Sequence, residues 1–269
     1  MCRLLGYVMR RPTAARATLA EGQFEDFTAL SSVHADGWGM AWTQGGALGS
    51  ATSPRAAADD ERYHDLAGKP LGDAGLVHLR WATDGLEVAP ENTHPFVEDG
   101  LALAHNGSIQ PVDRLDSLLA GHTRDGLRGT TDSERYFRLV LQERARGCSD
   151  VEAVQRTVAR MLQEFGHASL NALVLSPSQL IAVHASRTAA APLSDLEELF
   201  PGLSSAPMDH VEAYFQMRYR ETAEGVVVTS TGYTQSDWVG LPHNSMLVID
   251  RVTCATRVVD LASSLDAAS

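Results

Sequence analysis

Short runs of apolar and β-branched residues recur along the chain, and most are bounded by glycine, proline or small polar residues. Runs of this length and composition are typical of β-strands. The pair NALVLS and LIAVHA is separated only by residues 177–179, which predicts a hairpin. The pattern predicts strands over residues 4–8, 38–43, 74–80, 101–104, 171–176 and 180–185, around Met217, and over 226–230, 246–250 and 256–259.

Helical periodicity is clearest in the middle of the chain. Between residues 149 and 165 apolar side chains recur at intervals of three and four, which places them on one face of a helix. A second helix is predicted over 133–144 and a shorter amphipathic helix over 24–30. The stretch from residue 45 to about residue 60 is small, polar and charged, so we expect mostly exposed connection there.

Strands at both ends with helices between them favour layered sheets of an α+β protein over an alternating βαβ series. No repeat or inner boundary divides the 269 residues, so a single domain over residues 1–269 is expected. The Ala/Ser-rich end after Leu261, about 8 residues long, is expected to be frayed. The segment from 81 to 96 is long for a plain connection, which favours a functional role.

Composition narrows the classes of partner. The chain carries 34 acidic and 22 basic side chains, for a formal charge of −12, and has no Lys/Arg-rich block. Nucleic acid and anionic membranes are therefore not expected partners. No apolar stretch approaches the length of a membrane span and the N-terminus lacks the layout of a signal peptide, so a cytoplasmic protein is expected.

The three cysteines are Cys2, Cys148 and Cys254. They are odd in number, lie far apart and lack the paired spacing of zinc ligands, so neither a disulfide framework nor a structural metal is expected. No glycine-rich phosphate loop appears, and no cofactor is expected. Cys2 has two interpretations. It is either a small buried hydrophobic residue or, after removal of Met1, a residue that carries both a thiol and a free α-amine.

Four short patterns, of which the first contains Cys2, have to be considered together. They are MCRLLGY at the start, HLRWAT at 78–83, AHNGSI at 104–109 and TTDSE at 130–134. Together they resemble the class II, or N-terminal-nucleophile, glutamine amidotransferases. With HADGWG and ENTHPF, the chain is similar to the small stand-alone branch, which includes the γ-glutamyl hydrolase of ergothioneine biosynthesis. The resemblance covers about residues 2–260 and implies a four-layer αββα sandwich, the Ntn-hydrolase fold, in which Cys2 starts an inner strand.

The resemblance implies that Cys2 is the nucleophile and that its own α-amine accepts the thiol proton. It gives the Asn106 side-chain amide and the Gly107 backbone N–H the role of oxyanion donors. The alternative for this pair is an ordinary Asn-Gly turn. Removal of Met1 is essential to this scheme, because a peptide-bonded nitrogen is not a base.

The resemblance places Arg80, Trp81 and Thr83 in the glutamine pocket and Asp132 on the substrate amine. A guanidinium can hold a carboxylate with two parallel hydrogen bonds, and a carboxylate can accept from an ammonium group. The alternatives are a surface arginine at a strand end and, for Asp132, an N-cap of a helix that starts at Ser133.

The match has departures. Asp84 stands where larger members have a histidine, and HADGWGM lacks an arginine that those members have near the nucleophile, which leaves the acceptor side of the site undefined. His94 and His105 are candidates for orienting the reacting groups, with an ordinary structural role as the alternative. Trp38 is expected in the core. Asn171 receives no role.

Three functions are compatible with these residues. The first is a cysteine-nucleophile hydrolase that cleaves the γ-amide of glutamine or a small γ-glutamyl compound through a γ-glutamyl thioester. The second is a glutaminase subunit that supplies ammonia to a separate synthetase, and the third is a non-catalytic binding module on the same fold. The chain has no room for a fused synthase domain, which favours the hydrolase. The retained nucleophile and oxyanion donors argue against the binding module.

Overall fold

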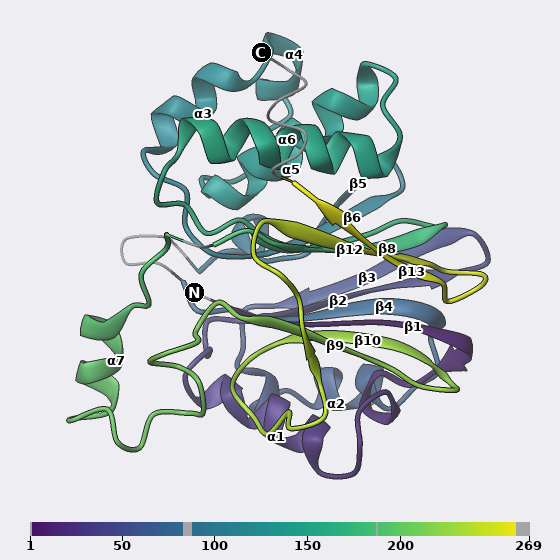
Figure 1. The fold of residues 1–269 in the computed structure, drawn as a ribbon, viewed down its shortest axis with the longest axis vertical. Coiled ribbons are helices and arrows are strands. Elements are labelled where there is room, and N and C mark those ends of the chain that lie inside the picture. The colour runs from purple at the N-terminus through teal and green to yellow at the C-terminus, as the bar shows by residue number, and fades with distance from the viewer. Residues whose placement is uncertain (1, 83–87, 187, 262–269) are drawn as a thin grey trace.

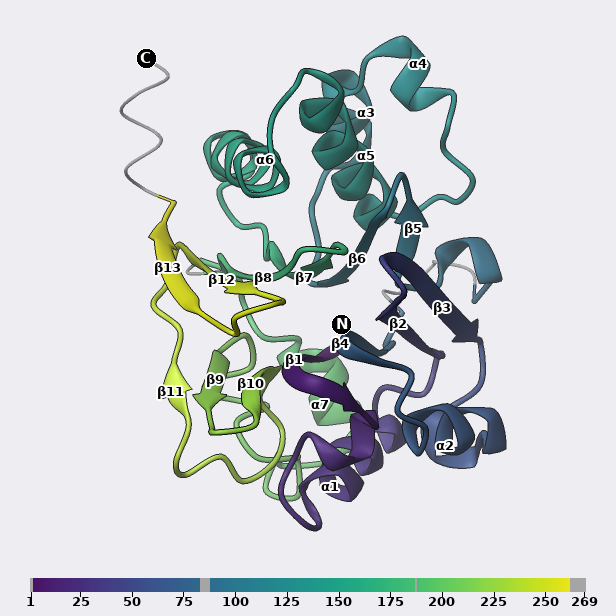
Figure 2. The ribbon, with the colours of Figure 1, turned by 90° about the vertical axis from the view of Figure 1, so that its right-hand side faces the viewer.

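Two antiparallel β-sheets lie face to face in the computed structural model, which describes residues 2–82, 88–186 and 188–261. Helices cover the outer face of each sheet, so the molecule has four layers in the order helix, sheet, sheet, helix (Figure 1). Figure 2 shows the two groups of helices at opposite ends of the molecule, with both sheets between them. The predicted α+β class and αββα layering are confirmed.

In the described part of the chain the first sheet has seven strands in the order β11-β9-β10-β1-β4-β2-β3. Its central strand β1 pairs with β10 on one side and β4 on the other. The strands are β1 (Arg3–Thr13), β2 (Trp38–Gln44), β3 (Ala47–Ser53), β4 (Gly72–Leu79), β9 (Met217–Glu221), β10 (Gly225–Ser230) and β11 (Val239–Gly240).

The second sheet has six strands within the described ranges, in the order β13-β12-β8-β7-β6-β5. The predicted hairpin is present as β7 and β8, and the register of β6 on β7 places Asn106 opposite Asn171. The strands are β5 (Phe96–Glu98), β6 (Leu101–Asn106), β7 (Asn171–Leu175), β8 (Gln179–His184), β12 (Ser245–Asp250) and β13 (Thr256–Asp260).

The helices fall into two groups. Helices α1 (Gln23–Ala29) and α2 (Glu61–Ala67) lie against the first sheet, and α7 (Leu193–Leu199) lies to one side of the sheets in Figure 1. Four helices cover the second sheet: α3 (Val112–Leu118), α4 (Gly121–Arg124), α5 (Asp132–Ala145) and α6 (Asp150–Glu164). Single 3₁₀ turns occur at Ala15–Ala17, Leu30–Ser32, Ala57–Asp59 and Pro90–Asn92.

Three apolar layers separate the four structural layers. Strand β1 shows why, because successive side chains of a strand point to opposite faces. Leu4 and Val8 belong to the layer between the sheets, whereas Leu5 and Tyr7 belong to the layer under α1 and α2. A third layer lies between α5, α6 and the second sheet. Both faces of β1 are therefore buried, and its start is held deep in the molecule.

Helices α5 and α6 begin at side-chain caps. Ser149 accepts a hydrogen bond from the Glu152 N–H and the Glu152 carboxylate accepts from the Ser149 N–H, which together form a capping box. Thr131 caps α5 by accepting from the Glu134 N–H. The interpretation of Asp132 as the N-cap of a helix that starts at Ser133 is therefore wrong, because Asp132 is already the first helical residue and its side chain faces other donors.

The stretch from 45 to about 60 differs from its prediction as mostly exposed connection, because most of its first half forms the edge strand β3. The small residues of β3 have weak strand propensity, and pairing with β2 through the turn at Gly45 and Gly46 supplies the structure. Asp60 is buried and accepts from the indole N–H of Trp38 at 2.9 Å. Trp38 is fully buried, as expected.

Several short elements have no counterpart in the sequence prediction, namely β5, β11, α2, α3, α4 and α7. Strand β1 is also longer than predicted, because it continues to Thr13. The end predicted to be frayed lies outside the described residues. Over the ranges that the structure describes, no helix combines the length and apolar character needed to cross a membrane.

Candidate active site

Cys2 lies directly before β1 and is 6% exposed. Its backbone N–H donates to Oδ1 of Asn106 at 2.9 Å, and its thiol lies 3.8 Å from the carbonyl oxygen of Trp81, to which it donates. Three segments that are far apart in sequence thus meet at this one residue. Met1 lies outside the described residues, so its removal stays a prediction.

Asn106 ends β6 and has no exposed surface. Because its Oδ1 accepts from Cys2, its Nδ2 is the donor that remains. Within the described ranges this buried Nδ2 has no hydrogen-bond partner. A buried amide donor without a partner is costly, by about 1–3 kcal/mol, and is therefore uncommon. The arrangement leaves one strong donor beside Cys2 for a ligand.

Gly107 follows Asn106 without the positive φ of a tight hairpin turn. The Asn106–Gly107 pair is therefore the end of a strand, not the ordinary Asn-Gly turn. A Cβ at Gly107 would lie 2.1 Å from the backbone oxygen of Ser169, so only glycine permits this close approach. The Ser169 hydroxyl donates to the Asn106 carbonyl at 2.9 Å, which fixes the strand end further.

A small cavity beside Cys2 brings together three of the four predicted substrate-binding residues, Arg80, Trp81 and Asp132. It is lined by Cys2, Arg80, Trp81, Gly107 and Asp132, among others. Its free volume is about 20 Å³, which is room for about one water molecule. Glutamine does not fit into this space, so substrate binding has to widen the cavity.

Asp132 lies at the start of α5 and is 6% exposed. Its carboxylate accepts from the N–H of Ile109 at 2.7 Å and from the N–H of Ser133 at 2.8 Å. These bonds orient the carboxylate from two elements, the segment after β6 and the first turn of α5. A carboxylate held in this way at a cavity wall can accept from an ammonium group.

Arg80 directly follows β4 and is 3% exposed, so the interpretation as a surface arginine is wrong. Its guanidinium donates to the carbonyl oxygen of Asp36 at 3.3 Å. Trp81 also lines the cavity, and its ring lies 5.6 Å from the ring of His34, edge to face. Thr83 and Asp84 lie outside the described residues.

A histidine pair lies next to the nucleophile. Nδ1 of His94 and Nε2 of His78 are 2.9 Å apart, and one donor atom each from Cys2, His78 and His94 lies within 4.8 Å of the other two. His78 is on β4 and His94 precedes β5. Gly39 makes this approach possible, because a Cβ there would lie 1.9 Å from the backbone oxygen of His94.

The electrostatics of this cluster favour neutral imidazoles. Burial lowers the pKa of both histidines to about 3. Burial alone raises the pKa of the Cys2 thiol, but the hydrogen bond with the adjacent His94 side chain and other nearby groups outweigh it, so the pKa is lowered. A lowered pKa favours the thiolate, which is the nucleophilic form of a cysteine.

His105 orients the wall of the site from the opposite sheet. Its Nε2 donates to the carbonyl oxygen of Ser169 at 2.7 Å, so its Nδ1 is the acceptor for the Ser133 hydroxyl at 2.8 Å. These two bonds join the end of β6 to the first turn of α5. His105 thus links the segment of Asn106 to that of Asp132.

Sequence reasoning missed Arg3, which has no exposed surface. Its guanidinium donates to the carbonyl oxygens of Cys2 at 3.0 Å and Tyr214 at 3.4 Å, lies over the Tyr214 ring and contacts Nε2 of His210 at 2.9 Å. No acidic side chain pairs with it in the part of the chain that the structure describes. One sequence feature pointed to Arg3, which is a charged residue directly after Cys2 in an otherwise apolar run.

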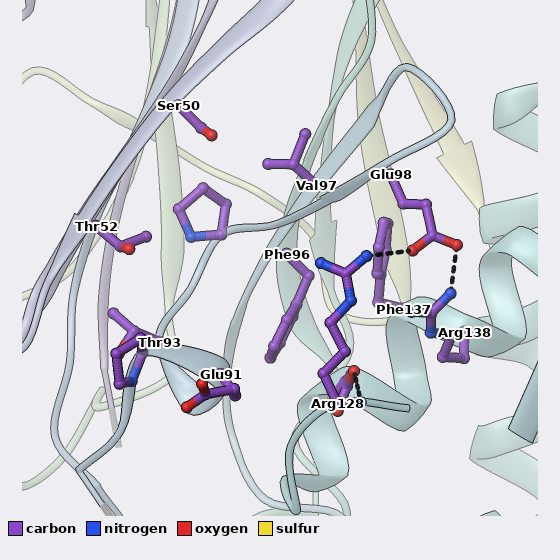
Figure 3. Close-up of a pocket in the computed structure, with 13 residues that line it drawn as sticks. Ser50, Thr52, Glu91, Thr93, Phe96, Val97, Glu98, Arg128, Phe137 and Arg138 are labelled. Carbon is purple, nitrogen blue, oxygen red and sulfur yellow. Dashed lines mark hydrogen bonds and ion pairs between the residues drawn. The ribbon is translucent and has the colours of Figure 1, made fainter. Parts of the chain in front are cut away.

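A second, larger cavity of about 180 Å³ lies on the far side of the segment that carries His94. Glu91, Thr93 and Pro95 line it, whereas Asn92 and His94 line the cavity at Cys2, so alternate residues of one segment face two cavities. Figure 3 shows its walls, with the Glu98 carboxylate between the guanidinium groups of Arg128 and Arg138. Its other lining residues are Ser50, Thr52, Pro90, Phe96, Val97, Glu134 and Phe137.

Face-to-face sheets covered by helices, with a cysteine at the start of an inner strand, define the Ntn-hydrolase fold. Solved structures agree. A glutamine aminotransferase class-II domain protein from Silicibacter pomeroyi superposes with a TM-score of 0.65 at 20% identity over 97% of this chain and 99% of that one. A glutamine phosphoribosylpyrophosphate amidotransferase from B. subtilis gives 0.63 at 15% identity over 97% of this chain and 49% of that one.

The family model for class-II glutamine amidotransferases matches residues 1–264. The chain therefore belongs to the class II glutamine amidotransferases, a family of enzymes. Similar curated proteins include glutamine–fructose-6-phosphate aminotransferases [isomerizing]. That of Brucella abortus biovar 1 (strain 9-941) is 39% identical over 39% of this chain and 17% of its own length. That of Yersinia pseudotuberculosis serotype I (strain IP32953) is 31% identical over 68% of this chain and 28% of its own length. The chain thus spans under a third of these relatives.

Proposed function

We propose that the protein hydrolyses the γ-amide of glutamine, or of a small γ-glutamyl compound, with Cys2 as nucleophile. The observation that carries this proposal is the Asn106 side chain. Its oxygen is fixed by the Cys2 N–H, and its buried Nδ2 has no partner within the described ranges. A binding module has no use for such a donor beside a thiol, whereas an acyl-transfer site needs one.

The proposed reaction has two halves. The Cys2 α-amine, free once Met1 is removed, takes the thiol proton, and the thiolate attacks the carboxamide carbon. The oxyanion of the tetrahedral intermediate accepts from Asn106 Nδ2 and from the Gly107 N–H. The intermediate collapses to a γ-glutamyl thioester as the protonated amine gives its proton to the leaving ammonia or amine. Water then cleaves the thioester to glutamate and restores the thiol.

Substrate selection is assigned to Arg80 and Asp132. Both line the cavity that Cys2 lines, and they supply opposite charges for the α-carboxylate and α-ammonium groups of a glutamyl substrate. Trp81 contributes to the same wall, and Thr83 is proposed to do so from the family resemblance. The cavity has to widen before a substrate binds. We expect these residues then to enclose the glutamyl end of the substrate.

A second function is favoured by the curated relatives, whose names describe aminotransferases several times longer than the matched region. In this alternative the chain releases ammonia to a separate synthetase. The chemistry at Cys2 is unchanged, and only the fate of the ammonia differs. A cytoplasmic location, a single domain and the absence of nucleic-acid and membrane partners stay predictions from the sequence.

The test uses protein whose intact mass shows that Met1 is absent. It is incubated with glutamine, a γ-glutamyl anilide and γ-glutamyl thioether amides, and glutamate and the released amine are quantified by mass spectrometry. We expect turnover of at least one substrate and none in the Cys2→Ala variant. Rapid quenching should trap a glutamyl adduct on Cys2. Full activity of protein that retains Met1, or of Cys2→Ala, would refute the proposed mechanism.

If ammonia is destined for a partner, glutamine alone should turn over slowly. Addition of a lysate fraction that contains the synthetase should then raise glutamate release, and the raised release should disappear with Cys2→Ala. If a γ-glutamyl amide instead turns over much faster than glutamine in the isolated protein, the hydrolase is favoured over the glutaminase subunit.

A further inference from the structure

We infer that Cys2, His78 and His94 form a binding site for a thiophilic divalent cation of the zinc class, which occupies the nucleophile and switches hydrolysis off. The binding of the cation does not depend on the proposed function, whereas the inhibition rests on it. Sequence spacing could not show this site, because its ligands come from three separate segments.

The donor set fits such an ion. One thiol and two imidazoles are the ligand types that zinc prefers in proteins. All three residues are buried, and their donor atoms lie within 4.8 Å of one another. A tetrahedral zinc ion with usual bond lengths places its ligands roughly 3.3–3.6 Å apart. The widest separation therefore has to contract by at most about 1.5 Å, and the His78–His94 contact has to lengthen from 2.9 Å.

The protons of the histidine pair can be rearranged without charging either ring. Nδ1 of His94 and Nε2 of His78 now share one hydrogen bond, whereas Nε2 of His94 and Nδ1 of His78 are buried with no partner in the described ranges. Moving the shared proton to the outer nitrogen of its own ring leaves both inner nitrogens with free lone pairs. These two lone pairs and the thiolate then bind the cation, and the thiol proton is released to solvent.

The surroundings also suit a small ion. Cys2 and His94, but not His78, line a cavity with about 20 Å³ of free space, which has room for an ion or a water molecule but not for glutamine. Asp132 lines that cavity and offsets part of the positive charge, although Arg80 opposes it. In the processed chain the α-amine of Cys2 is a further ligand, because amine and thiolate of one cysteine close a five-membered chelate ring.

Binding is tested with cobalt(II) and zinc(II) on processed, metal-free protein kept reduced. We expect one equivalent of cobalt per chain and a thiolate-to-cobalt charge-transfer band. Cys2→Ser should abolish the band, and His78→Ala and His94→Ala should each weaken zinc binding at least tenfold in competition with a chromophoric chelator. Cys148→Ser is the matched control, because it removes a thiol outside the site, and it should bind like the parent.

A measurement without substitutions guards against variants that fail to fold. Zinc should protect Cys2, but not Cys148, from alkylation by iodoacetamide in the parent protein, as read by peptide mass mapping. Zinc should also inhibit hydrolysis, and EDTA should restore it. Absence of a charge-transfer band, equal protection of both cysteines, or zinc affinity unchanged in both histidine variants would overturn the inference. If hydrolysis is never observed, the binding and alkylation results still decide it.

Discussion

Asn106 provides the sharpest test of the active site, because its two amide atoms have different predicted roles. Replacement by alanine removes the Nδ2 donor and the Oδ1 acceptor of the Cys2 N–H. Loss of one oxyanion donor costs about 2.7–4 kcal/mol of transition-state stabilisation, or about 10²–10³ in kcat. The substrate carbonyl is neutral before attack, so KM should change little.

The same substitution should have a small effect on stability. It leaves the buried Cys2 N–H without its acceptor, which costs about 1–3 kcal/mol, but it also removes a buried unpartnered donor that costs a similar amount. The two contributions oppose each other. We therefore expect the free energy of unfolding of Asn106→Ala to lie within about 1 kcal/mol of the parent value.

Asn171 is a matched control, because it lies directly opposite Asn106 in the β6–β7 register. Both of its amide atoms are satisfied, by the N–H of Ala185 at 3.0 Å and the carbonyl oxygen of Phe215 at 2.5 Å. Asn171→Ala should thus lower the free energy of unfolding by about 1–3 kcal/mol and affect kcat less.

The assay compares kcat and KM from glutamate release with urea unfolding for both variants and for Asn106→Asp. The aspartate keeps an acceptor for Cys2 but removes the donor, so it should be at least as slow as the alanine variant. Asn106→Ala with kcat within about fivefold of the parent would refute the oxyanion role, because one lost donor should cost far more. So would an Asn106→Asp variant that keeps parent activity.

Three further predictions concern charged groups around Cys2. Arg80→Ala and Asp132→Ala should each raise KM for substrates with a free α-amino acid end by at least tenfold, and equal KM values would show that the pocket is misplaced. Arg3→Met should move the acid limb of the kcat/KM profile up by roughly one pH unit, because the buried guanidinium disfavours a protonated Cys2 amine, whereas Arg3→Lys should keep the limb in place. His78 and His94 have pKa values of about 3 when folded and about 6.5 when unfolded. The free energy of unfolding should therefore decrease as the pH is lowered, by about 1.5 kcal/mol per histidine between about pH 6.5 and about pH 5, because the unfolded state binds the protons. Urea unfolding of His78→Gln should show a shallower pH dependence, and an unchanged slope would contradict the assignment.

The elements that could be predicted from the sequence are those whose own residues determine their structure. Strands β7 and β8 are continuous apolar runs around a short turn, and α6 combines a capping box with regular apolar spacing. Strand β3 could not be predicted, because its small residues have little strand preference and its pairing with β2 supplies the structure. Helices α3, α4 and α7 each bury a single residue, so no apolar spacing marks them. Helix α1 is as short, but its buried Phe24 and Phe27 are three positions apart.

The candidate site divides in the same way. Cys2, Asn106, Gly107 and Asp132 stand in the motifs that carry the family resemblance, and the structure brings them together. Arg3 stands out in the sequence as a charge in an apolar run, but neither it nor His78 could be given a role, because their contacts are with sequence-distant partners. The burial of Arg3 beside Cys2, without an acidic partner in the described ranges, results from the fold and cannot be read from the sequence.

Unpaired polar atoms around Cys2 connect the stability of the fold to its function. Fourteen buried side-chain nitrogen and oxygen atoms in the described residues have no hydrogen-bond partner, and four belong to Arg3, His78, His94 and Asn106. Three of these residues contact Cys2 and the fourth contacts His94. Each such atom costs about 1–3 kcal/mol when nothing binds it. In the proposed reaction an oxyanion is the missing partner of Asn106, whereas the outer imidazole nitrogens of His78 and His94 gain no partner from it. For Asn106 the cost is thus carried in the free protein and recovered in the proposed transition state, which is the arrangement that preorganised donors require.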